Sequence, residues 1–350
     1  MDNQALQAIE YSVISLPEKP LLVPWVTWVS RGDDRLQFRG AEFSFSLSHA
    51  LFIDTFYKIQ PLLDGCHSVG EIASSGGEAI LPTTITFLLK MLRANGILQE
   101  AHPSYLLSSE ISSDEISSEK RQALFLSHIL LDSGSGLESL SKVRLGFIGE
   151  GSLADEIKIS LRSVGITNIF PSNSESLAKD IESEGIEFFI ACRESPGFSF
   201  FEGVNEKCLA AGIRWMHIAQ EGTKALLGPT MVPFQTACYK CYSTRIDALV
   251  PDLESHLAFK KAHDQQPRDE GYFPPLGKTV AGQVALEVAR IFLGFSLPKT
   301  FGCCYEYDVD RMAPIRHDVL RFPRCPACYR KNPPMDIWDA QYPSPVVDEK

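Results

Sequence analysis

The stretch Thr236-Ala237-Cys238-Tyr239-Lys240-Cys241 has a counterpart near the C-terminus, Cys325-Pro326-Ala327-Cys328. Two residues between cysteines let a tight turn aim both sulfurs at one point, and two such turns complete a tetrahedral thiolate shell. A redox pair or an iron–sulfur cluster also uses cysteines at this spacing. Because neither turn contains histidine and closed all-sulfur shells are the usual structural zinc pattern, we predict one zinc ion. Its predicted ligands are Cys238, Cys241, Cys325 and Cys328.

A closed shell leaves no position for water or substrate, so we expect this metal to be structural and not catalytic. The chain between the two cysteine turns must loop out and return. The metal is therefore expected to tie the C-terminal part of the protein to its middle.

Composition limits the possible classes of protein. A chain of 350 residues with 44% hydrophobic residues can bury a sizeable core in two or three domains. The net charge is −11 without a basic stripe, which argues against nucleic acid or an anionic membrane as partner. No run has transmembrane length and the first residues are unlike a signal peptide, so we expect a soluble, cytoplasmic protein. We expect Cys66, Cys192 and Cys208, which lie in apolar stretches, to be buried reduced thiols.

The first hundred residues predict a winged helix-turn-helix domain. Period-two alternation predicts strands over 26–30, 36–38 and 42–47. Apolar residues at helical spacing then predict a helix over 50–63, a short helix capped by Ser68, and a helix over 82–94. A last short strand is expected at 97–99.

The helix over 82–94 has an apolar stripe on two faces. Ile85, Leu88, Leu89 and Leu92 form the core stripe, and Thr84, Phe87 and Met91 line a second face. Either the helix is enclosed in a larger core, or it forms one wall of a groove beside a free strand edge, to which a peptide adds as a further strand. The candidate peptide-binding residues are Phe43, Phe45, Leu47, Thr84, Phe87 and Met91.

The second domain begins with a Rossmann-type pattern. A buried strand over 143–148 runs into Gly149-Glu150-Gly151-Ser152-Leu153-Ala154 and then a helix, an arrangement in which glycines let the backbone approach a phosphate. Strands and helices then alternate, which predicts a parallel α/β sheet. We divide the chain into a winged-helix domain (1–102), a serine-rich acidic linker with a helix (103–140), the α/β domain (141–335) and a tail (336–350).

Two resemblances to known families follow. The pattern Leu62-Leu63-Asp64-Gly65 with Ser68-Val69 and Asn95-Gly96-Ile97-Leu98 resembles the leader-peptide recognition domain of ribosomal-peptide (RiPP) biosynthesis. In that family the leader adds as a strand and packs against the third helix. From 142 to 329, the zinc turns, the Gly228-Pro229 strand before them and the Ala-rich helix over 279–293 resemble ThiF-like, ubiquitin-activating-type adenylating enzymes. That family pairs its α/β domains, so a homodimer is expected, with this helix as a candidate surface.

The sequence departs from a working adenylating enzyme. Phe170-Pro171-Ser172-Asn173 lacks the acid that binds the ATP ribose, and the segment 174–185 is too short to supply the family's charged residues. Cys192-Arg193-Glu194 stands where the family carries an aspartate, and the loop over 242–301 has no cysteine nucleophile. We therefore predict a degenerate domain without catalytic residues, and ATP is not expected as a cofactor. Arg193, Glu194, His217 and Glu221 lie at strand ends, where they are either functional or a solvated rim.

Together the two domains resemble the leader-binding partner proteins of azoline-forming YcaO cyclodehydratases (TOMM biosynthesis). The resemblance implies that the chain binds the leader of a precursor peptide and presents its core to a YcaO-family enzyme, which forms thiazolines or oxazolines. The alternatives are an ATP-dependent adenylating enzyme that acts on a peptide, and a DNA-binding winged-helix regulator, which the acidic charge disfavours.

Overall fold

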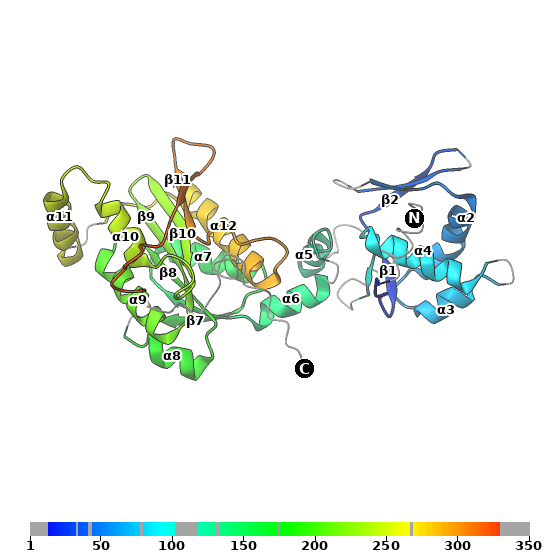
Figure 1. Cartoon of the computed structure of the whole chain (residues 1–350), viewed down its shortest axis with the longest axis horizontal. Coiled ribbons are helices and arrows are strands. Elements are labelled where there is room, and N and C mark those ends of the chain that lie inside the picture. Colours follow the sequence, from blue (N-terminus) through cyan, green and yellow to red (C-terminus); the bar gives the residue numbers. More distant parts are fainter. Residues whose placement is uncertain are drawn as a thin grey trace. The chain divides into compact units, whose positions relative to one another are not determined.

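The computed structural model divides into two compact units, unit 1 (Met1–Glu138) and unit 2 (Ser139–Lys350), shown in Figure 1. The structure describes residues 13–32, 34–40, 44–77, 80–101, 118–130, 133–173, 175–266 and 269–329. The predicted tail over 336–350 lies outside these ranges, as do residues 103–117, 131 and 132 of the predicted linker.

Unit 1 contains two small antiparallel sheets. In the three-stranded sheet β2 pairs with β3 and β3 with β4, so β4 lies at its edge. The second sheet joins β1 to β5, with Leu21 opposite Gln99. The strands are β1 (Pro20–Leu22), β2 (Thr27–Ser30), β3 (Leu36–Arg39), β4 (Ser44–Leu47) and β5 (Leu98–Glu100).

Three of the helices that the structure describes in unit 1 pack with both sheets around one core, to which α5 (Ser118–Leu126) contributes no residue. The rings of Phe38 and Phe56 are fully buried and meet edge to face at 4.8 Å between centroids. The predicted cap at Ser68 is present: its hydroxyl accepts from the backbone N–H of Glu71, and the Glu71 carboxylate accepts from the N–H of Ser68. The helices among the described residues of this unit are α2 (Ala50–Ile59), the 3-10 turn η1 (Gln60–Leu62), α3 (Val69–Ser74), α4 (Pro82–Ala94) and α5 (Ser118–Leu126). The order of three strands and three helices agrees with the sequence; the winged helix-turn-helix assignment stays a prediction.

Unit 2 is built on a seven-stranded sheet in the order β12-β11-β10-β9-β8-β6-β7. The four strands β6, β7, β8 and β9 are mutually parallel, and β10, β11 and β12 each pair antiparallel with their neighbours. The prediction of a parallel α/β sheet is therefore confirmed for these four strands and wrong for β10, β11 and β12. The strands are β6 (Arg144–Ile148), β7 (Asn168–Ser172), β8 (Phe188–Arg193), β9 (Arg214–Glu221), β10 (Lys224–Met231), β11 (Cys303–Asp308) and β12 (Ile315–Asp318).

The change of direction begins at a tight hairpin between β9 and β10. Glu221 pairs with Lys224, so two residues connect the strands, and Gly222 has φ +55°. A two-residue link cannot accommodate the long crossover that a parallel pair needs, and glycine tolerates the positive φ that such turns use.

Helices cover both faces of the sheet (Figure 1). α7 and α12 lie against one face, where the buried residues of both helices share a core with β6, β8, β9 and β10. α8, α9 and the start of α10 pack on a second core. The helices are α7 (Ser152–Ser163), α8 (Leu177–Glu184), α9 (Phe198–Ala211), α10 (Tyr239–Asp247), α11 (Leu253–Gln265) and α12 (Pro274–Leu293), while α6 (Ser133–Lys142) includes the last residues of unit 1 and the first of unit 2. In the described part of the chain, no helix has the length and apolar character needed to cross a membrane.

The cysteines outside the paired turns differ in burial. Cys192 and Cys208 are buried, as predicted, but Cys66 is exposed, so that prediction is wrong. The reason is local, because Cys66 belongs to the turn at Asp64, whose carboxylate accepts from the N–H of Cys66 at 2.8 Å. Such a turn lies at the surface, where Asp satisfies its backbone.

Candidate functional site

The structure brings the four predicted zinc ligands together. Cys238 directly precedes α10 and Cys241 lies in its first turn, and both Cys325 and Cys328 belong to the C-terminal turn. All four side chains are at most 2% exposed. The Sγ atoms of Cys238 and Cys241 lie 3.8 Å apart, those of Cys238 and Cys325 3.7 Å, and those of Cys241 and Cys328 3.6 Å. Tetrahedral zinc with bonds of about 2.3 Å requires sulfurs roughly 3.8 Å apart, so this buried set fits a structural zinc ion.

The surroundings favour thiolate at Cys241. Hydrogen bonds from the Cys238 and Cys328 thiols and from the N–H of Phe322 lower the pKa of the Cys241 thiol. The Phe322 nitrogen lies 3.3 Å from the sulfur. Thiolate is the form that binds metal, so hydrogen bonds of this kind favour the state that a metal ligand needs.

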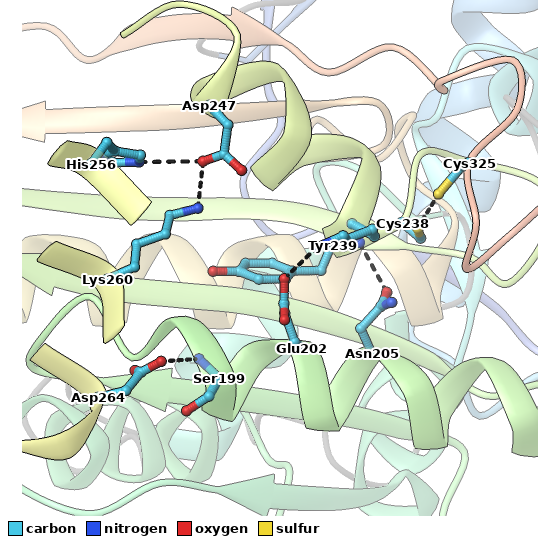
Figure 2. Close-up of polar contacts among 11 residues, drawn as sticks. Ser199, Glu202, Asn205, Cys238, Tyr239, Asp247, His256, Lys260, Asp264 and Cys325 are labelled. Atoms are coloured by element: carbon cyan, nitrogen blue, oxygen red, sulfur yellow. Dashed lines mark hydrogen bonds and ion pairs between the residues drawn. The ribbon is translucent and has the colours of Figure 1, made fainter. Parts of the chain in front are cut away.

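Buried hydrogen bonds fix the start of α10 beside the cysteine cluster (Figure 2). The N–H of Tyr239 donates to Asn205 Oδ1 on α9 at 2.9 Å, and Asn205 is 3% exposed. At the next residue, nearer the surface, the ammonium group of Lys240 donates to Glu202 of α9 at 2.8 Å. The start of α10 is therefore fixed to α9 on one side and meets the cysteines of the C-terminal turn on the other.

The predicted peptide-binding residues occupy two elements of unit 1. Among the described residues β4 pairs with β3 alone, so its other edge has unpaired backbone groups. Phe45 is half-buried and packs on Phe38 at 6.0 Å. Leu47 is only 2% exposed, so it contributes backbone rather than side chain to this edge. Phe43 lies outside the described residues.

On α4, the side chains of Thr84, Phe87 and Met91 are half-buried, while the core stripe beside them is fully buried. The ring of Phe87 stacks on Phe52 of α2 at 5.8 Å. Phe56, one turn further along α2, contacts the aromatic residues of the three-stranded sheet. α2 thus connects the two elements, and Phe52 is a residue that the sequence analysis missed, although it stands four residues before Phe56. We define the β4–α4 surface as Phe45, Leu47, Phe52, Thr84, Phe87 and Met91.

A cavity of about 720 Å³ lies at the carboxyl ends of the parallel strands of unit 2. Its lining includes the predicted glycine turn after β6 and residues that follow β7 and β8. At the end of β7 the Ser172 hydroxyl donates to Asp180 on α8 at 2.6 Å, and Ser176 donates to the same carboxylate oxygen. These bonds lower the pKa of Asp180. Hereafter this space is called the strand-end cleft; its lining is Phe147, Ile148, Gly149, Glu150, Lys158, Pro171, Ser172, Asn173, Arg193, Glu194, Ser195, Phe200 and Asp269.

The other strand-end residues lie elsewhere. His217 is 2% exposed and its Nδ1 lies 2.8 Å from the carbonyl oxygen of Gly228, so it is a core residue and not part of a rim. Burial lowers its pKa to about 4. Glu221 lines a different cavity of about 1050 Å³ between β9–β12 and α10–α11, where burial and then repulsion by Glu270 and Glu306 raise its pKa.

Polar contacts fasten α11 beside that second cavity (Figure 2). Asp247 at the end of α10 accepts from Lys260 at 2.5 Å, and its carboxylate lies 3.3 Å from His256 Nε2. At the far end of α11, Asp264 accepts from the N–H of Ser199 at 3.1 Å. α11 is thus joined to both α10 and α9.

Several solved structures share this fold. The heterocyclase TruD aligns with a TM-score of 0.67 and 19% sequence identity, over 89% of this chain and 43% of the TruD chain. MccB from E. coli aligns with a TM-score of 0.56 and 14% identity, over 89% of this chain and 97% of MccB. The microcin C7 biosynthetic enzyme MccB in complex with N-formylated MccA gives 0.57 and 15% identity, over 89% and 99%.

No protein-family model and no curated protein matches the sequence. At identities below one fifth the structural likeness establishes the fold and not the activity. The chain spans less than half the length of TruD and nearly the whole length of MccB. It therefore has the fold of MccB and of a part of the heterocyclase TruD.

Proposed function

We propose that this chain binds the leader of a ribosomal precursor peptide on unit 1 and presents the core to a partner YcaO-family cyclodehydratase for azoline formation. In this role it has no catalysis of its own and acts as the activating subunit of an ATP-dependent enzyme. A homodimer and a cytoplasmic location belong to the same proposal.

The shared fold supports a role in peptide modification. One structural relative is described as a heterocyclase in complex with substrate and cofactor, and MccB has been solved with the peptide MccA. The present chain covers 43% of the TruD chain. On this proposal, the heterocyclase activity that the single longer TruD chain carries is here divided between two proteins, the present chain and a partner.

The observation that carries the proposal is the β4–α4 surface. The outer edge of β4 offers backbone N–H and C=O groups in register for an added strand. Half-buried Phe87 and Met91 on α4 offer apolar contacts for alternate side chains of such a strand. Backbone pairing gives affinity and the apolar contacts give specificity, which is how an extended leader segment is recognised.

The test measures binding of a fluorescein-labelled leader to the full-length protein by fluorescence anisotropy, with the leader taken from any short Cys/Ser/Thr-rich peptide gene that is found next to the gene for this chain. We expect Phe87→Ala to raise Kd about 5- to 150-fold, because losing a buried aromatic anchor costs roughly 1–3 kcal/mol. Phe125→Ala is a matched control, since Phe125 is 64% exposed on α5 of the same unit. Its Kd should equal that of the wild type. Binding left unchanged by both Phe87→Ala and Met91→Ala contradicts the assignment.

A second candidate is an ATP-dependent adenylating enzyme that acts on a peptide. The observation in its favour is the alignment with nearly the whole length of MccB, which is described as a biosynthetic enzyme. Peptide-dependent exchange of labelled pyrophosphate into ATP by the isolated chain would establish this function in place of the first.

A further inference from the structure

The glycine turn between β6 and α7 is filled by the protein's own chain. A Cβ atom on Gly149 would lie 2.2 Å from the carbonyl oxygen of Cys192, and one on Gly151 would lie 2.7 Å from Glu194 Oε1. Both glycines also have positive φ, +139° and +103°. The turn therefore needs glycine to let the end of β8 and the residue that follows it approach closely, whether or not a phosphate is bound.

The Glu194 carboxylate occupies the N-terminus of α7. Its Oε1 accepts from the backbone N–H of Leu153 at 2.5 Å. Leu153 is the second residue of the helix, so its N–H has no acceptor within the helix and points outward with the positive end of the helix dipole. In a Rossmann-type turn this position receives a phosphate oxygen. Here a carboxylate that is fixed by the chain takes it.

The charges that line the strand-end cleft also disfavour the binding of a phosphate group. Its lining has three carboxylates, Glu150, Glu194 and Asp269, against two cations, Lys158 and Arg193, which leaves a net charge of −1. Both cations lie over aromatic rings, Lys158 over Phe147 at 4.9 Å and Arg193 over Phe200 at 4.9 Å. A polyphosphate entering the cleft would meet a net negative lining as well as an occupied helix terminus.

We infer that Glu194 determines ligand selection in the strand-end cleft: its carboxylate replaces a phosphate at α7 and excludes phosphate-bearing ligands, nucleotides included. The inference deepens the proposed function, because it gives the physical reason why a presenting subunit with this fold does not adenylate. Glu194 is a selecting residue and takes no part in a reaction.

The test titrates the full-length protein with inorganic pyrophosphate and with ATP, each with and without Mg²⁺, by isothermal titration calorimetry. Glu194→Ala frees the Leu153 N–H and makes the lining neutral, so we expect pyrophosphate affinity to rise at least tenfold. Glu194→Gln keeps an acceptor for Leu153 and removes only the charge, so we expect a smaller gain. Glu150→Gln is the matched control: it removes the same charge from an exposed side chain of the cleft, and should gain less than Glu194→Ala.

Two results would overturn the inference. One is wild-type protein that binds Mg-ATP and loses it in Glu194→Ala, which would make Glu194 a ligand of the metal–nucleotide complex. The other is a folded Glu194→Ala or Glu194→Gln variant with no gain for either anion. Should Glu194→Ala not fold, Glu194→Gln decides alone. Leader binding, measured on the same proteins, separates the two proposals, because the β4–α4 surface belongs to unit 1 and Glu194 to unit 2. If wild-type protein does not bind the leader, the proposed function is rejected, while the result for Glu194 is unaffected.

Discussion

Replacing Cys241 by serine tests the metal cross-link at a fully buried sulfur. The loop from Cys241 to Cys325 has about 84 residues, and a cross-link that closes a loop of that length removes roughly 4.6 kcal/mol of unfolded-state entropy at 25 °C. A domain has only about 5–15 kcal/mol of net stability. Because zinc binding is also folding free energy at such a site, we expect Cys241→Ser to remove most of the stability of unit 2.

Cys208→Ser is the matched control. Cys208 is equally buried in the same unit, on α9, and lies outside the set of four cysteines. A hydroxyl in place of a buried thiol costs about 1–3 kcal/mol, so Cys241→Ser should exceed this control by at least about 2 kcal/mol. Urea-dependent hydrogen exchange with mass spectrometry gives the free energy of unfolding for β9 and β10, with α4 of unit 1 as internal reference. Metal content is measured on the same samples.

Two outcomes would refute the reasoning. Wild-type protein never exposed to chelator should contain close to one zinc per chain, and a folded sample without zinc removes the site. Equal destabilisation by Cys241→Ser and Cys208→Ser would mean that the four sulfurs do not act as a cross-link.

Two further predictions concern buried polar side chains. Gln99 is 2% exposed and neither atom of its amide has a partner among the described residues, so Gln99→Met should stabilise unit 1 by about 1–2 kcal/mol in urea denaturation, and a loss of stability would contradict this. Burial lowers the pKa of His217 to about 4, below its unfolded value near 6.5, so the unfolded state binds the extra proton and stability falls as pH drops from 6.5 to 4. The loss between pH 7 and pH 5 is about 2 kcal/mol, and His217→Phe, compared with wild type in excess zinc, should reduce the pH dependence by that amount.

Features encoded by neighbouring residues could be predicted from the sequence. The capping box at Ser68, the helix that begins at Pro82 and the strand–glycine turn–helix at Gly149 all depend on residues within a few positions of one another. The four-cysteine cluster is an exception, because this contact between distant parts of the chain could be predicted from the sequence. Its two Cys-x-x-Cys turns are incomplete metal sites on their own, and completing a tetrahedral shell requires that they meet.

Features that depend on contacts across the sheet could not be predicted in the same way. The contact between Leu153 and Glu194 joins residues 41 positions apart, and nothing local to either marks it. The polarity of His217 suggested that its side chain lies at the solvated rim of the sheet. Instead β9 is buried on both faces, and His217 lies in the core. One local feature did indicate the antiparallel strands, namely Gly222 in the short turn between β9 and β10. The alternation of strands and helices along the chain favoured a parallel sheet instead.

The Glu194 contact also sets the condition that an adenylating role would have to meet. For a nucleotide to bind at α7, the carboxylate has to leave the Leu153 N–H, and a phosphate oxygen has to replace it; the helix terminus then exchanges one anion for another and gains no new hydrogen bond. The exchange is favourable only if the displaced carboxylate finds a cation elsewhere. Within the described cleft both cations, Lys158 and Arg193, lie over aromatic rings, and Lys158 also pairs with Asp155 at 3.4 Å. A divalent metal that binds together with the nucleotide is the remaining cation that could pair with the displaced Glu194 carboxylate. The magnesium dependence of nucleotide binding therefore separates a cleft that excludes nucleotides from one that admits them only with the metal.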